Sequence, residues 1–200
     1  MRSGSYFEPV AGESFDLIVS NPPFVISPDS ALLFRHTGFG RDEVSRQVVR
    51  AAAEHLSDGG FAYILVNWVQ PPTSGWMTVL ADWLEETGCD ALCLLHGIED
   101  PVGYAVRWNV REQQLRQDRY GATLDRWLEH FRSEGIGAIG SGAIILRRSA
   151  GKPWLHGVEL SGDSRGSAAP HVQALFSRSE ERRVGKECTE QCRSRWSPYH

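Results

Sequence analysis

The stretch Phe15–Pro28, FDLIVSNPPFVISP, carries the strongest structural signal in the sequence. Its first six residues form a nearly continuous apolar run, which is typical of a β-strand covered on both faces. Pro22 and Pro23 then end any strand ladder, because proline has no N–H to donate and its ring fixes the backbone. The sequence therefore predicts a rigid corner, Asn21–Phe24, directly after a buried strand.

Strand and helix patterns alternate after this corner. Short apolar runs predict four strands, at residues 16–19, 61–66, 91–95 and 143–146. Between the first two strands, apolar residues repeat every four positions and predict a helix, at Val44, Val48, Ala52 and Leu56. Asp42 is the candidate N-cap of this helix, and the glycine pair 59–60 is its expected stop. This order of strand, helix and strand is typical of a parallel crossover.

A second helix with a core-facing stripe follows the second strand. The stripe consists of Trp76, Val79, Leu80, Trp83 and Leu84. Thr73 or Ser74 is the expected cap, and Gly88 is the expected end. A long insertion separates the last two strands, and it predicts one helix around Tyr104–Leu115 and another that ends at Gly135.

These elements predict an α/β fold in residues 1–150. Residues 151–177 are rich in Gly, Ser and Pro and predict a loop-rich C-terminal segment. Residues 178–200 follow neither a helical nor a strand period, and we interpret them as a non-native or disordered tail.

The composition excludes several broad classes of protein. The net charge of −4 excludes an overall basic, nucleic-acid-binding chain, although it leaves room for a local basic face. No apolar run approaches the roughly 20 residues of a membrane-spanning helix, and the first residues lack a signal sequence. The four cysteines lack the spacing of zinc sites. We therefore expect a cytoplasmic protein without a metal ion or a membrane contact.

The corner has the chemistry to hold a planar NH2 group. It lies after the carboxyl end of a strand, which is where open α/β sheets bind ligands. The Asn21 side-chain oxygen and the Pro22 carbonyl are two acceptors, and Phe24 offers a ring face. Two fixed acceptors stabilise the positive charge that develops on such a nitrogen as it attacks an electrophile. The alternative interpretation is a strand terminator with a structural asparagine.

The segment Asp16–Phe24, DLIVSNPPF, resembles the fourth motif of class I S-adenosylmethionine (SAM)-dependent methyltransferases that act on planar nitrogens. Such motifs mark release-factor glutamine, ribosomal RNA guanine-N2 and adenine-N6 methyltransferases. The upstream segment GSYFEPV also resembles the glutamine enzymes. The resemblance spans Gly4–Arg148. It implies the C-terminal half of a Rossmann-like sheet, with strands four to seven in the spatial order 4-5-7-6, the last strand antiparallel, and a helical insertion before it.

The same resemblance implies a cofactor, a substrate class and a set of site residues. The cofactor is SAM, and the substrate is a planar amino nitrogen of RNA, ribosomal RNA in particular, or of a protein glutamine. The implied catalytic residues are Asn21 and Pro22. The implied substrate-binding residues are Asn21, Pro22, Pro23 and Phe24. The implied cofactor-binding residues are Ser5, Tyr6, Ser20 and Asn21.

The sequence departs from this family in its first half. No glycine-rich turn follows a first strand, and the glycine-rich segment Gly135–Gly142, GIGAIGSG, precedes the last strand instead. We therefore expect a methyltransferase fragment, truncated at its N-terminus and inactive alone. The other hypothesis is a non-catalytic α/β module without a cofactor. Nucleotide hydrolysis has no Gly-Lys-Ser/Thr phosphate loop to support it.

Other residues allow two interpretations. Asn67 and Trp68 end the second strand, where they either border a pocket or serve as a cap and a packed ring. The insertion mixes arginine and aromatic residues with carboxylates, which suits either a nucleic-acid surface or, as we favour, a salt-bridged helical face. Candidates for phosphate contact or for turns lie in the loop after the corner, at Asp29, Ser30, Arg35 and His36.

Overall fold

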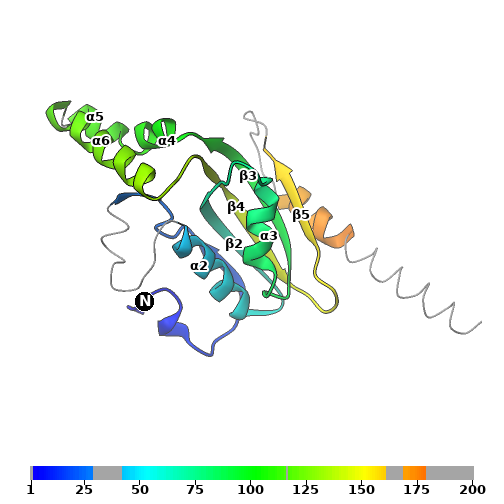
Figure 1. Ribbon diagram of the computed structural model, residues 1–200. Helices are drawn as coiled ribbons and strands as arrows, with labels where there is room; N and C mark the ends of the chain where they lie inside the picture. The colour runs from blue at the N-terminus through cyan, green and yellow to red at the C-terminus, as the bar shows by residue number, and fades with distance from the viewer. Residues whose placement is uncertain (1, 29–41, 116, 161–168, 179–200) are drawn as a thin grey trace, which may run out of the picture. The chain divides into compact units, whose positions relative to one another are not determined.

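The computed structural model describes residues 2–28, 42–115, 117–160 and 169–178. Its sheet has five strands in the order β1-β2-β4-β3-β5 (Figure 1). The strands are β1 (Phe15–Ser20), β2 (Leu56–Val69), β3 (Cys89–Glu99), β4 (Ile139–Arg148) and β5 (Leu155–Glu159). β1 runs parallel to β2, β4 runs antiparallel to both of its neighbours, and β5 runs parallel to β3. This arrangement confirms the predicted α/β fold, including the antiparallel strand that follows the insertion.

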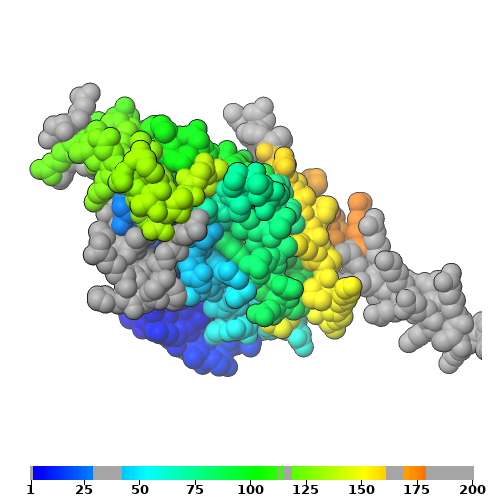
Figure 2. All heavy atoms as spheres, in the orientation of Figure 1, coloured from blue at the N-terminus to red at the C-terminus, as the bar shows by residue number. Residues whose placement is uncertain are grey.

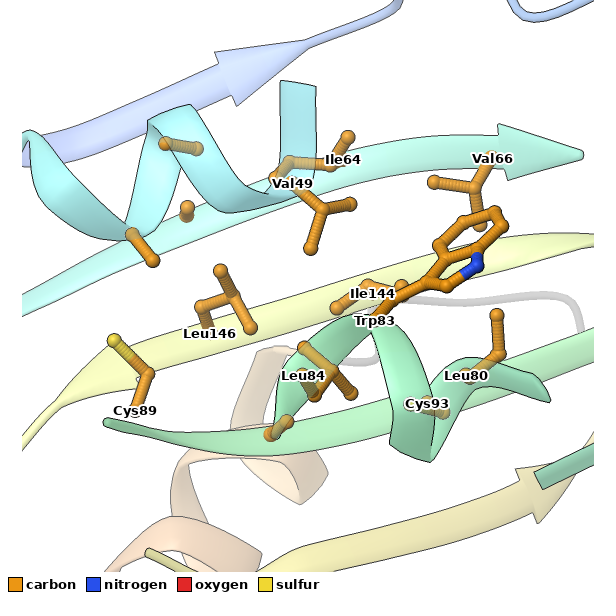
Figure 3. Close-up of a cluster of buried hydrophobic side chains, with 14 of the residues drawn as sticks. Val49, Ile64, Val66, Leu80, Trp83, Leu84, Cys89, Cys93, Ile144 and Leu146 are labelled. Atoms are coloured by element: carbon orange, nitrogen blue, oxygen red, sulfur yellow. The ribbon is translucent and has the colours of Figure 1, made fainter. Parts of the chain in front are cut away.

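Two helices, α2 (Glu43–Glu54) and α3 (Trp76–Leu84), cover one face of the sheet. In Figure 2 their atoms, in cyan and green, lie over that face. The side chains between helices and sheet form the larger of two cores (Figure 3). Its buried members include Val49, Ile64, Val66, Leu80, Trp83, Ile144 and Leu146. The apolar stripes of both helices therefore face the core, as their periodicity requires. Leu56, predicted as the last member of the first stripe, instead begins β2.

The structure confirms Asp42 as the N-cap position of α2 and corrects the other predicted helix boundaries. α2 ends at Glu54, and Gly59 and Gly60, its expected stop, lie within β2. α3 ends at Leu84, before Gly88.

Asp42 is the N-cap residue of α2, but its carboxylate accepts a hydrogen bond from the Val69 N–H at 2.8 Å and none from the helix. Gly75 is the N-cap of α3, and neither Thr73 nor Ser74 supplies a capping side chain. The tertiary contact at Asp42 outweighs the local one, because it satisfies a strand-end donor that would otherwise be left unpaired.

The first strand is covered on one face only, which corrects the prediction of two covered faces. Ile18 packs against the main core, whereas Leu17 is 60% exposed and Val19 is 74% exposed on the opposite face. β1 is also an edge strand of the sheet, so its outer edge pairs with no other described strand. A continuous apolar run shows that both faces are hydrophobic, but it does not show that both are covered.

The segment predicted as loop-rich contains a fifth strand. β5 packs against α3 through Gly157, where an added Cβ would lie 2.8 Å from the Trp76 ring. The Trp76 indole N–H also donates to the Glu159 carboxylate at 3.2 Å. The glycine that suggested a loop is thus the residue that lets the strand approach the helix. Residues 169–178, in a second compact unit, are helical.

The insertion folds into three helices, α4 (Pro101–Trp108), α5 (Val110–Leu115) and α6 (Gln117–Ser133). The first two replace the single helix that the sequence predicted. Together with Ile26, which follows the corner, and the ends of β2 and β4, the helices α4 and α6 form the second core. Its buried members are Ile26, Val69, Tyr104, Ala105, Trp127, Phe131, Ile136 and Ile139. The insertion is therefore packed against the segment that follows β1. A short 3-10 helix, η1 (Glu8–Val10), precedes β1.

None of the helices in the described ranges is long and apolar enough to cross a membrane.

Candidate functional site

The corner after β1 presents one free polar side chain. Asn21 is exposed, and its carboxamide makes no hydrogen bond to any other described residue. Pro22 is buried, so the corner is anchored immediately beyond the exposed amide. The structure thus places the exposed Asn21 amide next to a buried proline.

The Pro22 carbonyl is less available than predicted. It accepts a hydrogen bond from the Phe24 N–H at 2.7 Å, which closes a tight three-residue turn around Pro23. A carbonyl oxygen has two lone pairs, so one remains for a ligand. The turn fixes the direction of that carbonyl, and the Asn21 oxygen is the less encumbered of the two predicted acceptors.

The Phe24 ring is half-buried against the insertion. It makes an edge-to-face contact with Trp108 of α4, with the ring centroids 6.0 Å apart and the planes at 73°. Such aromatic contacts fix the orientation of a ring. The insertion thus forms part of the wall of the corner, a contact that no local sequence pattern predicts.

Asn67, the other asparagine at a strand end, has a structural task. It is only 1% exposed, and its side-chain Nδ2 donates to the Tyr104 hydroxyl at 2.6 Å. Its neighbour Trp68 is fully buried, and the Trp68 indole N–H donates to the Gln70 side chain at 3.0 Å. Of the two interpretations left open, the structure supports the packed ring for Trp68 and a structural role for Asn67, which lies within β2 and is not a cap.

Tyr104 connects the corner to the end of β2. Its hydroxyl also accepts a hydrogen bond from the Ile26 N–H at 3.1 Å. Burial raises the pKa of Tyr104 to about 12, so the phenol is neutral over the ordinary range of pH. The sequence predicted Tyr104 at the start of a helix within the mixed basic and aromatic insertion, and it gave no role to the hydroxyl. The available signal was Asp100-Pro101, a typical helix start that fixes where α4 begins.

The four residues proposed for the cofactor do not come together. Phe7 stacks on His55 with centroids 4.8 Å apart, and the His55 carbonyl accepts from the Phe15 N–H at the amino end of β1. Ser5 and Tyr6, next to Phe7 in the chain, therefore lie near the end of the strand away from Asn21. Six strand residues at about 3.3 Å each put roughly 20 Å between the two ends. Only Ser20 and Asn21 lie at the predicted corner.

The glycine-rich segment before the last strand serves packing. A Cβ at Gly140 would lie 2.1 Å from an atom of the Trp68 indole ring, and one at Gly142 would lie 2.1 Å from the Leu94 carbonyl oxygen. Both glycines lie within β4, where they let the indole lie against the backbone.

The insertion has the character of a salt-bridged face. The Arg107 guanidinium pairs with the Glu99 carboxylate, with its Nε 2.8 Å from one oxygen, and it lies over the Tyr104 and Trp108 rings. Arg132 forms an ion pair with Glu129. These contacts favour the structural interpretation over a nucleic-acid surface.

The described residues offer no metal centre. They contain no group of three or more His, Cys, Asp or Glu side chains placed to hold a metal ion. Cys89 and Cys93 are buried thiols, and burial raises the pKa of Cys93 to about 12. The candidate residues of the loop, Asp29, Ser30, Arg35 and His36, lie outside the described ranges.

Parts of two known enzymes are similar to this chain. It is 35% identical over 82 residues to a release factor glutamine methyltransferase of Xylella fastidiosa, covering 34% of this chain and 29% of the relative. It is 38% identical over 79 residues to the same enzyme of Geobacter sulfurreducens, covering 38% of this chain and 25% of the relative. The matches thus span less than a third of either relative. They support a relationship to methyltransferases, and no protein-family model matches the chain.

Solved structures show only a distant likeness. Phospholethanolamine N-methyltransferase 2 of Haemonchus contortus, solved with S-adenosylhomocysteine, is 12% identical and gives a TM-score of 0.36, with 68% of this chain and 33% of that chain covered. The [4+2]-cyclase SpnF is 15% identical with a TM-score of 0.33, with 70% and 51% covered. Both scores lie below 0.5, so the fold assignment rests on the strand order.

Proposed function

We propose that this chain carries the acceptor-binding part of a SAM-dependent N-methyltransferase whose substrate is the carboxamide NH2 of a protein glutamine. One observation carries the proposal, namely the exposed Asn21 carboxamide on a stiff corner at the carboxyl end of β1. The partial similarity to release factor glutamine methyltransferases supports it.

The corner suits a carboxamide because the two groups are complementary. A carboxamide NH2 has two donors and a delocalised lone pair, which makes it a poor nucleophile. The Asn21 Oδ1 accepts one N–H, and the free lone pair of the Pro22 carbonyl accepts the other. Acceptors held in place before binding stabilise positive charge on that nitrogen without reorganisation. Phe24, held by Trp108, limits the plane in which the amide lies.

SAM would supply the methyl group, but the described residues hold only a part of any site for it. Ser20 and Asn21 lie at the corner, while Ser5 and Tyr6 lie toward the other end of β1. The proposal therefore assigns to this chain the recognition of the acceptor amide, and assigns no transfer step to its described residues.

A protein glutamine fits better than a base of RNA. The arginines Arg107 and Arg132 are engaged with carboxylates, which reduces the positive charge that an RNA backbone requires. The absence of a complete SAM site among the described residues favours, as a second candidate, a non-catalytic α/β module. The two differ in whether the corner binds an amide at all.

The test compares two short peptides that differ at one residue, glutamine or glutamate. We expect the glutamine peptide to bind more tightly, and the Asn21→Ala variant to bind it about three- to tenfold more weakly, which corresponds to one net hydrogen bond. Asn21→Asp keeps an acceptor oxygen and should retain binding. Equal binding of both peptides, or no effect of Asn21→Ala, would favour the non-catalytic module. Tighter binding of guanosine or adenosine would favour an RNA substrate.

A further inference from the structure

We propose that Tyr104 is a positioning residue for the acceptor corner, because its hydroxyl ties the backbone after Asn21–Phe24 to the end of β2. The effect on substrate binding rests on the proposed function. The tie itself is a property of the fold and is tested separately.

The Tyr104 hydroxyl joins three segments that are far apart in the sequence. It accepts from the Ile26 N–H at 3.1 Å and from the Asn67 Nδ2 at 2.6 Å, and its own ring belongs to the insertion. Tyr104, Ile26 and Asn67 are all at most 1% exposed, so water does not replace these bonds. In a buried environment such bonds are costly to leave unmade.

The phenol is fixed from its own side. Asp100 accepts hydrogen bonds from the Val102 and Gly103 N–H groups at 2.8 and 2.9 Å, which sets the start of α4. The Tyr104 ring lies 6.0–6.4 Å, centroid to centroid, from three other rings, those of Trp108, Trp127 and Phe131. A hydroxyl on a ring held in this way is a stationary acceptor.

The hydrogen bond to Tyr104 matters because the corner lies beyond the end of β1 and is not held by strand pairing. Pro22 and Pro23 have no N–H, so this part of the backbone cannot continue the ladder of β1. Ile26 lies two residues beyond Phe24, and its bond to Tyr104 connects the corner to α4 and β2. Phe24 itself touches α4 through Trp108. Removal of the Tyr104 oxygen therefore frees the segment that orients the Pro22 carbonyl and the Phe24 ring.

The test is Tyr104→Phe, which keeps the ring and removes only the oxygen. The control is Tyr120→Phe in α6, since the Tyr120 hydroxyl makes no hydrogen bond within the described ranges. Amide hydrogen exchange is followed residue by residue. We expect exchange at Ile26 to become at least tenfold faster in Tyr104→Phe, with less than a threefold change at Ile64 and Ile144, and no change at any of these sites in Tyr120→Phe.

Two exchange results would overturn the positioning role. Unchanged exchange at Ile26 means that the Tyr104 hydroxyl does not restrain the backbone there. A parallel rise at Ile26, Ile64 and Ile144 means that Tyr104 only stabilises the whole domain.

Peptide binding separates this inference from the proposed function. With the glutamine peptide, Tyr104→Phe should bind at least threefold more weakly at a temperature where it is fully folded, while Tyr120→Phe binds like the wild type. If Tyr104→Phe binds like the wild type, the positioning role is refuted although the proposed function stands. If the wild type does not bind the peptide, the proposed function fails, and the role of Tyr104 in substrate binding fails with it.

Discussion

Asn21 and Asn67 are the same residue type near the carboxyl ends of neighbouring parallel strands, Asn21 just after β1 and Asn67 within β2, yet they have opposite surroundings. Asn21 is exposed and has no described partner, whereas Asn67 is buried and bonded to Tyr104. The two prolines after Asn21 end the strand, so the sequence alone predicts that Asn21 lies at its carboxyl end. The partner of Asn67 lies 37 residues away in the chain, so no local pattern could identify it.

The same limit applies to glycines. Gly140 and Gly142 belong to a glycine-rich segment that sequence alone does not distinguish from a ligand loop. In the structure, the Trp68 ring leaves no room for a side chain at position 140, and the Leu94 carbonyl leaves none at position 142. Close approach of two groups distant in sequence is the kind of information that a linear pattern lacks.

Gly140→Ala should destabilise the fold by about 1–3 kcal/mol, because the added methyl group overpacks a site that the buried Trp68 ring fills. Urea unfolding followed by tryptophan fluorescence measures the change. Gly137→Ala is the matched control, since a Cβ there meets no atom within 4 Å. Equal unfolding midpoints for both variants would refute the packing role of Gly140.

Helices and strands with a strong apolar periodicity were predictable from the sequence. A strand whose position depends on contacts at the edge of the sheet was not. The first four strands and the core faces of α2 and α3 follow directly from apolar spacing. β5 was missed because its composition is that of a loop, and its place depends on contacts with Trp76 and β3. The open face of β1 was missed because apolar runs do not report which face is covered.

The open face of β1 predicts self-association. Leu17 and Val19 are exposed apolar side chains on a strand whose outer edge is unpaired within the described sheet, which favours edge-to-edge contact. The double variant Leu17→Lys/Val19→Lys should sediment as a smaller species than the wild type at the same concentration, with an unchanged unfolding midpoint. Analytical ultracentrifugation measures this.

Ile18 provides the control on the same strand. It packs against the main core, so Ile18→Thr should lower the unfolding midpoint and should not reduce association. Sedimentation of the lysine variant identical to that of the wild type would show that this face does not mediate self-contact.

For the whole molecule, the strand order shows the α/β fold, and the partial matches support a relationship to methyltransferases. The chain spans less than a third of the length of the two relatives that it matches. Its described residues include the corner that we propose as the acceptor site, and only Ser20 and Asn21 of the four residues proposed for SAM lie there. The sequence predicted the corner from a short motif, and it could not predict that Ser5 and Tyr6 lie toward the far end of β1.

This whole-molecule view predicts weak binding of SAM. Calorimetric titration of the chain should give no affinity in the low-micromolar range, because Ser20 and Asn21 alone cannot enclose the cofactor. A dissociation constant of a few micromolar would mean that the chain assembles a cofactor site that the described residues do not show.

The most direct test of the central claim is a nuclear magnetic resonance titration of the wild-type chain with the glutamine peptide. The account predicts that the largest saturable shifts occur at the Asn21 side-chain NH2 and at the backbone amide of Phe24, and that the glutamate peptide leaves these signals in place. Largest shifts elsewhere in the domain, or the same shifts with both peptides, would contradict the assignment of this corner as a carboxamide-binding site.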